Sequence, residues 1–415
     1  MPDAIPKGLM RGRPAPRLGP RPLGLHLANQ LSILLNSRAG LPPLKAGSPP
    51  WNLPAQPAAA QLRDELAGVD PEGFAAALDA ESRRRIATFL HGIRLYRAHP
   101  YRRPPSEAPV AWRAGTTKVL RYGGEGGAPV LLVPSLVNRA YILDLSERRS
   151  LARYLAGRGL RPYLVDWDEP GEVEAGYDLG DYIARLESAL EAVAAENRRG
   201  VGVVGYCMGG LLALALAARR PDKVAALALL ATPWDFHAGG NHALVIRAMA
   251  PQLSAAIAAV GHLPVDVLQA FFTSVDPTLA DRKYRGFAAL SPRSRRAEDF
   301  VVLEDWVNDG VPLAARVATD CLFGWYGANQ PACGEWRVGG TPVRPEDVRA
   351  PALVLVPEKD RLVPPQSALA IARTLPAARH RLLPVGHIGM ISGRRARTLV
   401  YGPLSKWLGA CCSAT

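Results

Sequence analysis

The stretch Val201-Gly202-Val203-Val204-Gly205-Tyr206-Cys207-Met208-Gly209-Gly210 decides the fold of this chain. Its apolar and β-branched residues predict a buried strand, and the apolar run 211–219 predicts a helix directly after it. Cys207 falls at the sharp turn between them, with Gly205 and Gly209 two positions to either side. Because side chains at those positions would collide across so tight a turn, the glycines predict an elbow that presents the thiol. The alternative is a buried structural cysteine before a glycine-rich turn.

Two later segments supply the partners that a nucleophile elbow needs. Residues 352–357 predict a strand, and Asp360 lies in the turn after it. Residues 381–385 predict a second, weaker strand, and His387 follows it. Nucleophile, acid and histidine therefore occur in the chain order of an α/β-hydrolase. For the other histidines, none of which follows a late strand, we expect surface or helix-packing roles: His26, His91, His99, His237, His242, His262 and His380.

The upstream segments agree with this fold. Residues 129–134, 160–167 and 224–230 each predict a strand, and 178–197 predict a long helix with one apolar stripe. Strands that alternate with helices predict a mainly parallel sheet with helices on both faces. We therefore expect an α/β class protein with an α/β-hydrolase fold, and a site at the carboxyl ends of its strands.

The predicted constellation suits acyl transfer from a thioester. His387 would take the proton of the Cys207 thiol, and the helix N-terminus after the elbow would favour the thiolate. Asp360 would hold His387 in the correct tautomer. The backbone N–H of Met208 and that of Val137, in the loop 135–137, would bind the oxyanion.

Many phrases of the chain, in one order from about residue 118 to 408, resemble polyhydroxyalkanoate synthases. The similarity is closest to the short catalytic subunits of the class III type, and the first hundred residues do not share it. Tyr206 and Met208 differ from many synthases, which leaves substrate length open. The phrases are 136–145 (LVNRAYILDL), 163–167 (YLVDW), 205–210 (GYCMGG), 221–224 (PDKV), 232–236 (TPWDF), 306–310 (WVNDG), 329–330 (NQ), 359–365 (KDRLVPP) and 386–389 (GHIG).

The resemblance implies a specific activity. In that family a cysteine is acylated by a 3-hydroxyacyl-coenzyme A, and the chain grows as an enzyme-bound polyester; here it implies Cys207 as nucleophile, His387 as base and Asp360 as the third member. A role for Asp360 in activating the 3-hydroxyl of the next acyl group is a further hypothesis. The expected partners are 3-hydroxyacyl-coenzyme A, the growing polyester, a second synthase subunit, a second copy in a homodimer and a polymer granule surface. No other cofactor is expected.

We predict three regions along the chain. Residues 1–100 form a basic, Pro-rich tail and a helical extension, whose leucine stripe packs on the core or touches a granule surface. Residues 101–236 and 321–410 form the catalytic core. Residues 237–320 form a cap or lid over the elbow, or else helices beside the sheet. The basic residues Arg282, Lys283 and Arg285 bind coenzyme A phosphates or form a solvated helix face.

Composition limits the classes of protein to which the chain can belong. The length of 415 residues and the hydrophobic fraction of 48% indicate a globular protein, and its net charge of +13 is uneven, because residues 1–50 carry seven Lys and Arg side chains against a single acid, Asp3. No nucleic-acid module, membrane span, signal peptide or metal-ligand spacing is expected. Five cysteines without a pairing pattern predict a reducing cytoplasm, with granule association as a further expectation.

Three functions stay open at this point. The leading one is an acyltransferase that polymerises 3-hydroxyacyl-coenzyme A. The second is a cysteine-dependent hydrolase: a thioesterase, a polyester depolymerase or an enzyme similar to dienelactone hydrolases. The third is a non-catalytic granule-associated protein, against which the complete set Cys207, Asp360 and His387 argues.

Overall fold

The chain folds as two units, each with its own hydrophobic core. The structure is a computed structural model that describes residues 17–40, 42, 43, 46, 56–376 and 378–412. Unit 1 combines residues 1–101 with 277–308, and unit 2 combines 102–276 with 309–415. The predicted 237–320 insertion is therefore divided between the units, and its role as a lid stays a prediction.

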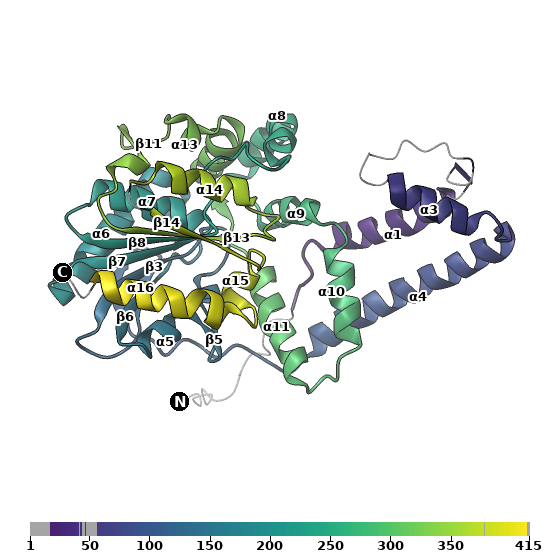
Figure 1. Cartoon of the computed structure of the whole chain (residues 1–415), viewed down its shortest axis with the longest axis horizontal. Coiled ribbons are helices and arrows are strands. Elements are labelled where there is room, and N and C mark those ends of the chain that lie inside the picture. The colour runs from purple at the N-terminus through teal and green to yellow at the C-terminus, as the bar shows by residue number, and fades with distance from the viewer. Residues whose placement is uncertain (1–16, 41, 44–45, 47–55, 377, 413–415) are drawn as a thin grey trace, which may run out of the picture. The chain divides into compact units, whose positions relative to one another are not determined.

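The described part of unit 2 contains one eight-stranded sheet, in the order β1-β2-β6-β3-β7-β8-β13-β14 (Figure 1). Strands β6 to β14 of this order run parallel, while β2 is antiparallel to both β1 and β6. Every predicted strand is present, although the last one begins three residues earlier than expected, at Ala378. The bounds are β1 (Val110–Ala114), β2 (Thr117–Arg121), β3 (Ala128–Val133), β6 (Leu160–Asp166), β7 (Val201–Tyr206), β8 (Val224–Leu230), β13 (Ala352–Pro357) and β14 (Ala378–Leu383).

Helices cover both faces of this sheet (Figure 1). On one face lie α6 (Leu179–Asn197), α7 (Met208–Arg219) and α14 (Pro365–Thr374); on the other lie α5 (Leu151–Ala156) and α16 (Gly402–Cys412). Successive strand residues point to opposite faces. Accordingly, Val203 joins the core under α6 and α7, whereas its neighbour Gly202 lies against Leu408 of α16.

Local sequence explains where α6 begins. The Asp178 side chain accepts from the N–H of Asp181 at 3.1 Å, and the Asp181 side chain accepts from the N–H of Asp178 at 2.9 Å. This reciprocal cap satisfies N–H groups that have no partner inside the helix. The buried stripe that follows includes Leu186 and Leu190, each of which contributes about 1.5–3 kcal/mol of burial.

Shorter elements complete unit 2. The two-stranded antiparallel sheet of β9 (His262–Leu263) and β10 (Leu313–Ala314) connects segments that are separated in the chain by unit 1 residues. The others are η2 (Ala140–Leu143), β4 (Asp144–Ser146), β5 (Arg149–Ser150), η3 (Glu174–Gly176), α8 (His242–Val260), α9 (Val265–Val275), α12 (Ala315–Thr319), the π-helix η4 (Asp320–Gly327), α13 (Gln330–Cys333), β11 (Arg337–Val338), β12 (Thr341–Pro342), η5 (Pro345–Asp347), α15 (Gly389–Ser392) and the π-helix η6 (Arg397–Tyr401).

Helix α8 differs from the expectation that no segment resembles a membrane span. It has 19 residues and a mean hydropathy of 1.6, and among the described helices it alone is long and apolar enough to cross a membrane. It also contains Arg247 and Pro251, and its exposed apolar side chains include Leu244 and Met249. Length and composition alone are weak evidence for a span.

Unit 1 is built from helices. Its core joins Phe89, Ile93 and Tyr96 of α4 to Tyr284 and Phe287 of α10. Residues 17–22 of the predicted tail are described, and within them the buried Arg17 pairs with Asp305 at 2.6 Å; residues 1–16 lie outside the described part. The helices are α1 (Leu23–Ala39), α3 (Gln56–Leu66), α4 (Pro71–Ala98), α10 (Leu279–Ala288) and α11 (Arg295–Asn308).

Candidate active site

The turn from β7 into α7 holds Cys207 in a strained conformation. Its φ of +55° lies in the left-handed region, which a residue with a side chain rarely adopts. A Cβ at Gly205 would lie 2.4 Å from the Cα of Gly210, and one at Gly209 would lie 2.3 Å from the carbonyl oxygen of Val133. Both positions therefore require glycine, and the elbow packs directly on the end of β3.

The structure places Asp360 and His387 in contact. Nδ1 of His387 and Oδ2 of Asp360 are 2.6 Å apart. The other carboxylate oxygen of Asp360 accepts from the N–H groups of Leu362 and Val363, each at 2.9 Å. Because the carboxylate is buried and bonded on both oxygens, its orientation toward the imidazole is fixed.

His387 also meets Cys207, which completes the contact between the three predicted residues. Burial alone lowers the pKa of His387, but the nearby charges of Cys207 and Asp360 and hydrogen bonds to both raise it to about 10. The charges around the ring thus favour a protonated imidazole at neutral pH. The Tyr206 ring lies against the imidazole at 5.3 Å between centroids, and its hydroxyl donates to the His387 carbonyl at 3.2 Å.

The two predicted oxyanion donors have different surroundings. Met208 is the first residue of α7, where helix N–H groups have no partner inside the helix. The N–H of Val137 donates to the Ser135 hydroxyl at 3.3 Å. An oxyanion bound at Val137 would share that N–H with the Ser135 hydroxyl.

An aromatic cluster around Tyr326 was not predicted. Burial raises the pKa of Tyr326, and the charges of Cys207, Cys321 and Asp360 add to that effect. Tyr326 and Cys207 both pack against the core of unit 2. The Tyr326 ring contacts Phe236 at 4.8 Å and Phe271 at 5.8 Å. Tyr326 belongs to the π-helix η4, and π-helical turns frequently occur at functional sites.

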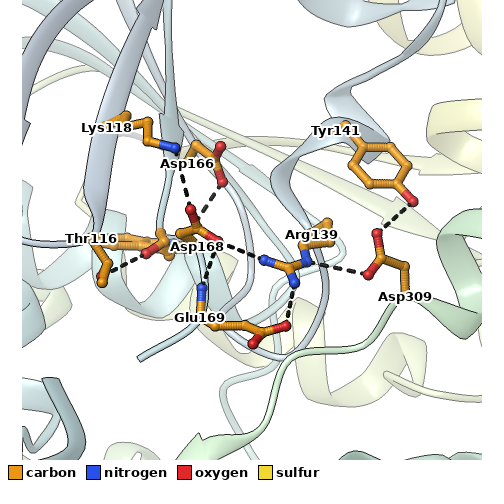
Figure 2. A network of polar contacts seen from close by, with 9 residues as sticks. Thr116, Lys118, Arg139, Tyr141, Asp166, Asp168, Glu169 and Asp309 are labelled. Carbon is orange, nitrogen blue, oxygen red and sulfur yellow. Dashed lines mark hydrogen bonds and ion pairs between the residues drawn. The ribbon is translucent and has the colours of Figure 1, made fainter. Parts of the chain in front are cut away.

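A polar network at the end of β6 was also missed as a site. Arg139 donates to Asp168 at 2.8 Å, to Asp309 at 3.3 Å and to Glu169 (Figure 2). Asp168 also accepts from Lys118 at 3.2 Å. Arg139 belongs to the segment 136–145 that resembles the synthases, but the carboxylates that it binds lie in other segments of the chain. The sequence alone therefore did not indicate this network.

The predicted coenzyme A contacts lie in unit 1, apart in the chain from the other site residues. Lys283 pairs with Glu304, Arg285 pairs with Asp281 at 2.9 Å, and Arg282 donates to the Thr278 hydroxyl. Phosphate binding by these side chains stays a prediction. Among the described residues, no group of three or more His, Cys, Asp or Glu side chains is arranged to hold a metal ion.

Comparison with known proteins adds family information. The model of the alpha/beta hydrolase fold family matches residues 128–393. The poly(3-hydroxyalkanoate) polymerase subunit PhaC of Synechocystis sp. is 32% identical over 283 residues, which cover 65% of this chain and 75% of that protein. The subunit of the same name from Thiocystis violacea is 30% identical over 285 residues, covering 68% and 80%. An alpha/beta hydrolase fold protein from Nakamurella multipartita aligns with a TM-score of 0.44 at 18% identity, over 72% of this chain and 96% of that one.

Proposed function

We propose that this chain, which belongs to the poly(3-hydroxyalkanoate) polymerase (PhaC) family of the α/β-hydrolase superfamily, links 3-hydroxyacyl groups from coenzyme A thioesters into a polyester. The observation that carries the proposal is the contact of Cys207, at a strained elbow, with an imidazole that Asp360 holds from its other side. A thiolate beside an imidazolium suits attack on a thioester, because the thiolate is the reactive form of cysteine.

In the first step Cys207 becomes acylated. Its Sγ, after giving its proton to Nε2 of His387, attacks the thioester carbonyl. The carbon–sulfur bond to coenzyme A breaks, and coenzyme A leaves as a thiol with the proton from the imidazolium. Asp360, bonded to Nδ1, stabilises the charged ring and keeps Nε2 directed at the reacting atoms. The N–H of Met208 and one from the loop 135–137 bind the oxyanion, and losing one such donor typically costs about 10²–10³ in rate.

In the second step an ester bond forms. The 3-hydroxyl of the next acyl group gives its proton to His387, assisted by Asp360, and its oxygen attacks the Cys207 thioester. The carbon–sulfur bond breaks, and Sγ leaves as a thiolate beside the protonated His387. The lengthened chain, which now ends in the coenzyme A thioester of the added unit, acylates Cys207 again as in the first step. Water must be kept from the acyl-enzyme throughout, and the aromatic cluster of Tyr326, Phe236 and Phe271, in the core against which Cys207 packs, would supply an apolar surface for this.

The wider setting of this function is also proposed. Both PhaC relatives are named subunits, which supports a second synthase subunit as a partner. A homodimer, contact with a polymer granule and a cytoplasmic location remain predictions.

Product analysis tests the proposal. Purified protein is given 3-hydroxybutyryl-coenzyme A, free thiol is followed in time, and the acyl product is recovered and sized. We expect thiol release with high-mass polyester, and loss of both in Cys207→Ala. Release of monomeric hydroxyacid alone would assign the chain to the hydrolases. Thiol release that persists in Cys207→Ala would remove Cys207 as the nucleophile. If the wild type releases no thiol, medium-chain thioesters are tested next.

A further inference from the structure

The loop that follows β3 is held in place from two sides. The indole N–H of Trp167 donates to the carbonyl of Pro134 at 3.1 Å, within a buried environment. On the other side, the N–H of Val311 donates to the carbonyl of Val137 at 3.0 Å, and Asn138 forms a β-bridge with Gly310. The peptide planes from which the loop presents its N–H groups are therefore set by β6 and by the segment 309–311.

One guanidinium joins these two supports. Arg139 is the next residue of the loop, and it binds Asp168 and Glu169 just after β6 and Asp309 just before the bridge (Figure 2). Two of the three partners are held by a further side chain: Asp168 accepts from Lys118, and Asp309 accepts from the Tyr141 hydroxyl at 3.0 Å. Only 20% of the Arg139 side chain is exposed.

Asp309 lies where the chain re-enters unit 2. Asp309 is the first residue of unit 2 after the excursion 277–308 into unit 1. In Figure 2, the side chains that contact Asp309 are those of Arg139 and Tyr141, and both hold it beside the loop. The next two residues, Gly310 and Val311, pair with Asn138 and Val137 of the loop. The alignment of these two backbone contacts therefore depends on where Asp309 is held.

We infer that Arg139 is a positioning residue for acyl transfer: by binding Asp168, Glu169 and Asp309 together, it sets the orientation of the oxyanion-binding N–H groups of the loop 135–138. The inference rests on the proposed function, because it assigns a role within that acyl transfer. Preorganised donors act only when their geometry is held. A displacement of about 1 Å can cost on the order of 10²-fold in rate even when it originates away from the chemistry.

Two reactions of the same thiol separate this role from general support of the fold. Acylation of Cys207 by p-nitrophenyl butyrate builds an oxyanion, whereas alkylation by iodoacetamide needs the thiolate and builds none. The burst of p-nitrophenol and the pH profile of alkylation are measured for wild type, Arg139→Gln, Arg139→Lys and Asp309→Asn. Arg220→Gln is the matched control, because Arg220 also binds two carboxylates, Glu191 and Asp222, in unit 2.

We expect Arg139→Gln to slow acylation by about 10- to 100-fold, Asp309→Asn to slow it less, and Arg139→Lys to recover part of the loss. All three should keep the wild-type alkylation profile within about twofold, as should Arg220→Gln for both reactions. Acylation that stays unchanged in Arg139→Gln and Asp309→Asn would overturn the inference, as would equal losses in acylation and alkylation. A wild-type Cys207 that is alkylated but is acylated neither by this ester nor by 3-hydroxyacyl-coenzyme A thioesters would instead overturn the proposed function, and this inference with it.

Discussion

Both units of the chain bury charged side chains, but they use them differently. In unit 1, Arg17, Asp305 and Tyr96 bind one another, with the Tyr96 hydroxyl donating to Asp305 at 2.8 Å. In unit 2, Asp360 binds an imidazole that also reaches a thiol. In the first arrangement the charged and polar groups serve as hydrogen-bond partners for one another, whereas in the second a proton can move between the thiol and the imidazole. A cluster of buried charges, as in unit 1, is therefore not by itself a reactive site.

The largest expected effect comes from a pair of histidine substitutions, one in each unit. His387→Gln removes the proton acceptor of Cys207, so we expect Cys207 acylation to fall by about 10³-fold or more. His99→Gln changes a buried histidine of unit 1 that bonds the Pro292 carbonyl at 3.0 Å, and we expect it to keep the acylation rate within about twofold. The p-nitrophenol burst measures both variants. An equal loss of acylation rate in the two variants would show that unit 1 takes part in the reaction, and the distinction between the two units would then fail.

A second pair of substitutions compares crowded glycines. A Cβ at Gly209 would lie 2.3 Å from the Val133 carbonyl oxygen, and one at Gly92 would lie 2.1 Å from the Tyr284 carbonyl oxygen. We expect Gly209→Ala and Gly92→Ala each to lower the free energy of unfolding by about 1–3 kcal/mol, because packed backbone must move. Only Gly209→Ala should also slow acylation, since it shifts the elbow against the end of β3. Thermal unfolding and the ester burst measure the two effects.

The control for this pair is Gly286→Ala in α10 of unit 1. Nothing lies within 4 Å of a Cβ at Gly286, and alanine favours the helix by about 1 kcal/mol over glycine. Gly286→Ala is therefore expected to be neutral or stabilising. If it destabilised the protein as much as Gly92→Ala, crowding at the contact of α4 with α10 would not explain the loss.

Most of the parallel part of the sheet could be predicted from the sequence because its signals are local. The strands β3, β7, β8 and β13 are short apolar runs, and β8 and β13 have the predicted bounds. The more polar β14 begins earlier than expected, and β1 and β2 were not predicted. The elbow glycines could also be inferred, since the turn itself excludes a Cβ there. The contact of Cys207, Asp360 and His387 was expected from chain order, while their catalytic roles remain to be tested.

What could not be predicted depends on contacts between distant segments. The helices α10 and α11 join the N-terminal helices in unit 1, but hydrophobic periodicity shows that a helix has an apolar face and not which helix covers it. Arg139 meets Asp309 from 170 residues away, and Tyr326 belongs to a π-helix, which hydrophobic periodicity does not predict. Lys283 and Arg285 form ion pairs with Glu304 and Asp281, and these pairs were not predicted from the sequence.

The smallest expected effect is a change in titration, and it compares buried histidines. Burial lowers the pKa of His26 in unit 1. Burial also acts on His387, but the charges of Cys207 and Asp360 override it and raise the pKa to about 10. His387 should therefore be protonated at neutral pH and lose its proton as the pH rises through about 10. In Cys207→Ala one of the two charges is gone, so the imidazole should lose its proton at a lower pH, while His26 titrates as before. Histidine ring signals followed by NMR against pH give both values. If the His387 titration did not move, Asp360 alone would account for the raised pKa, and the imidazolium would not depend on a thiolate beside it.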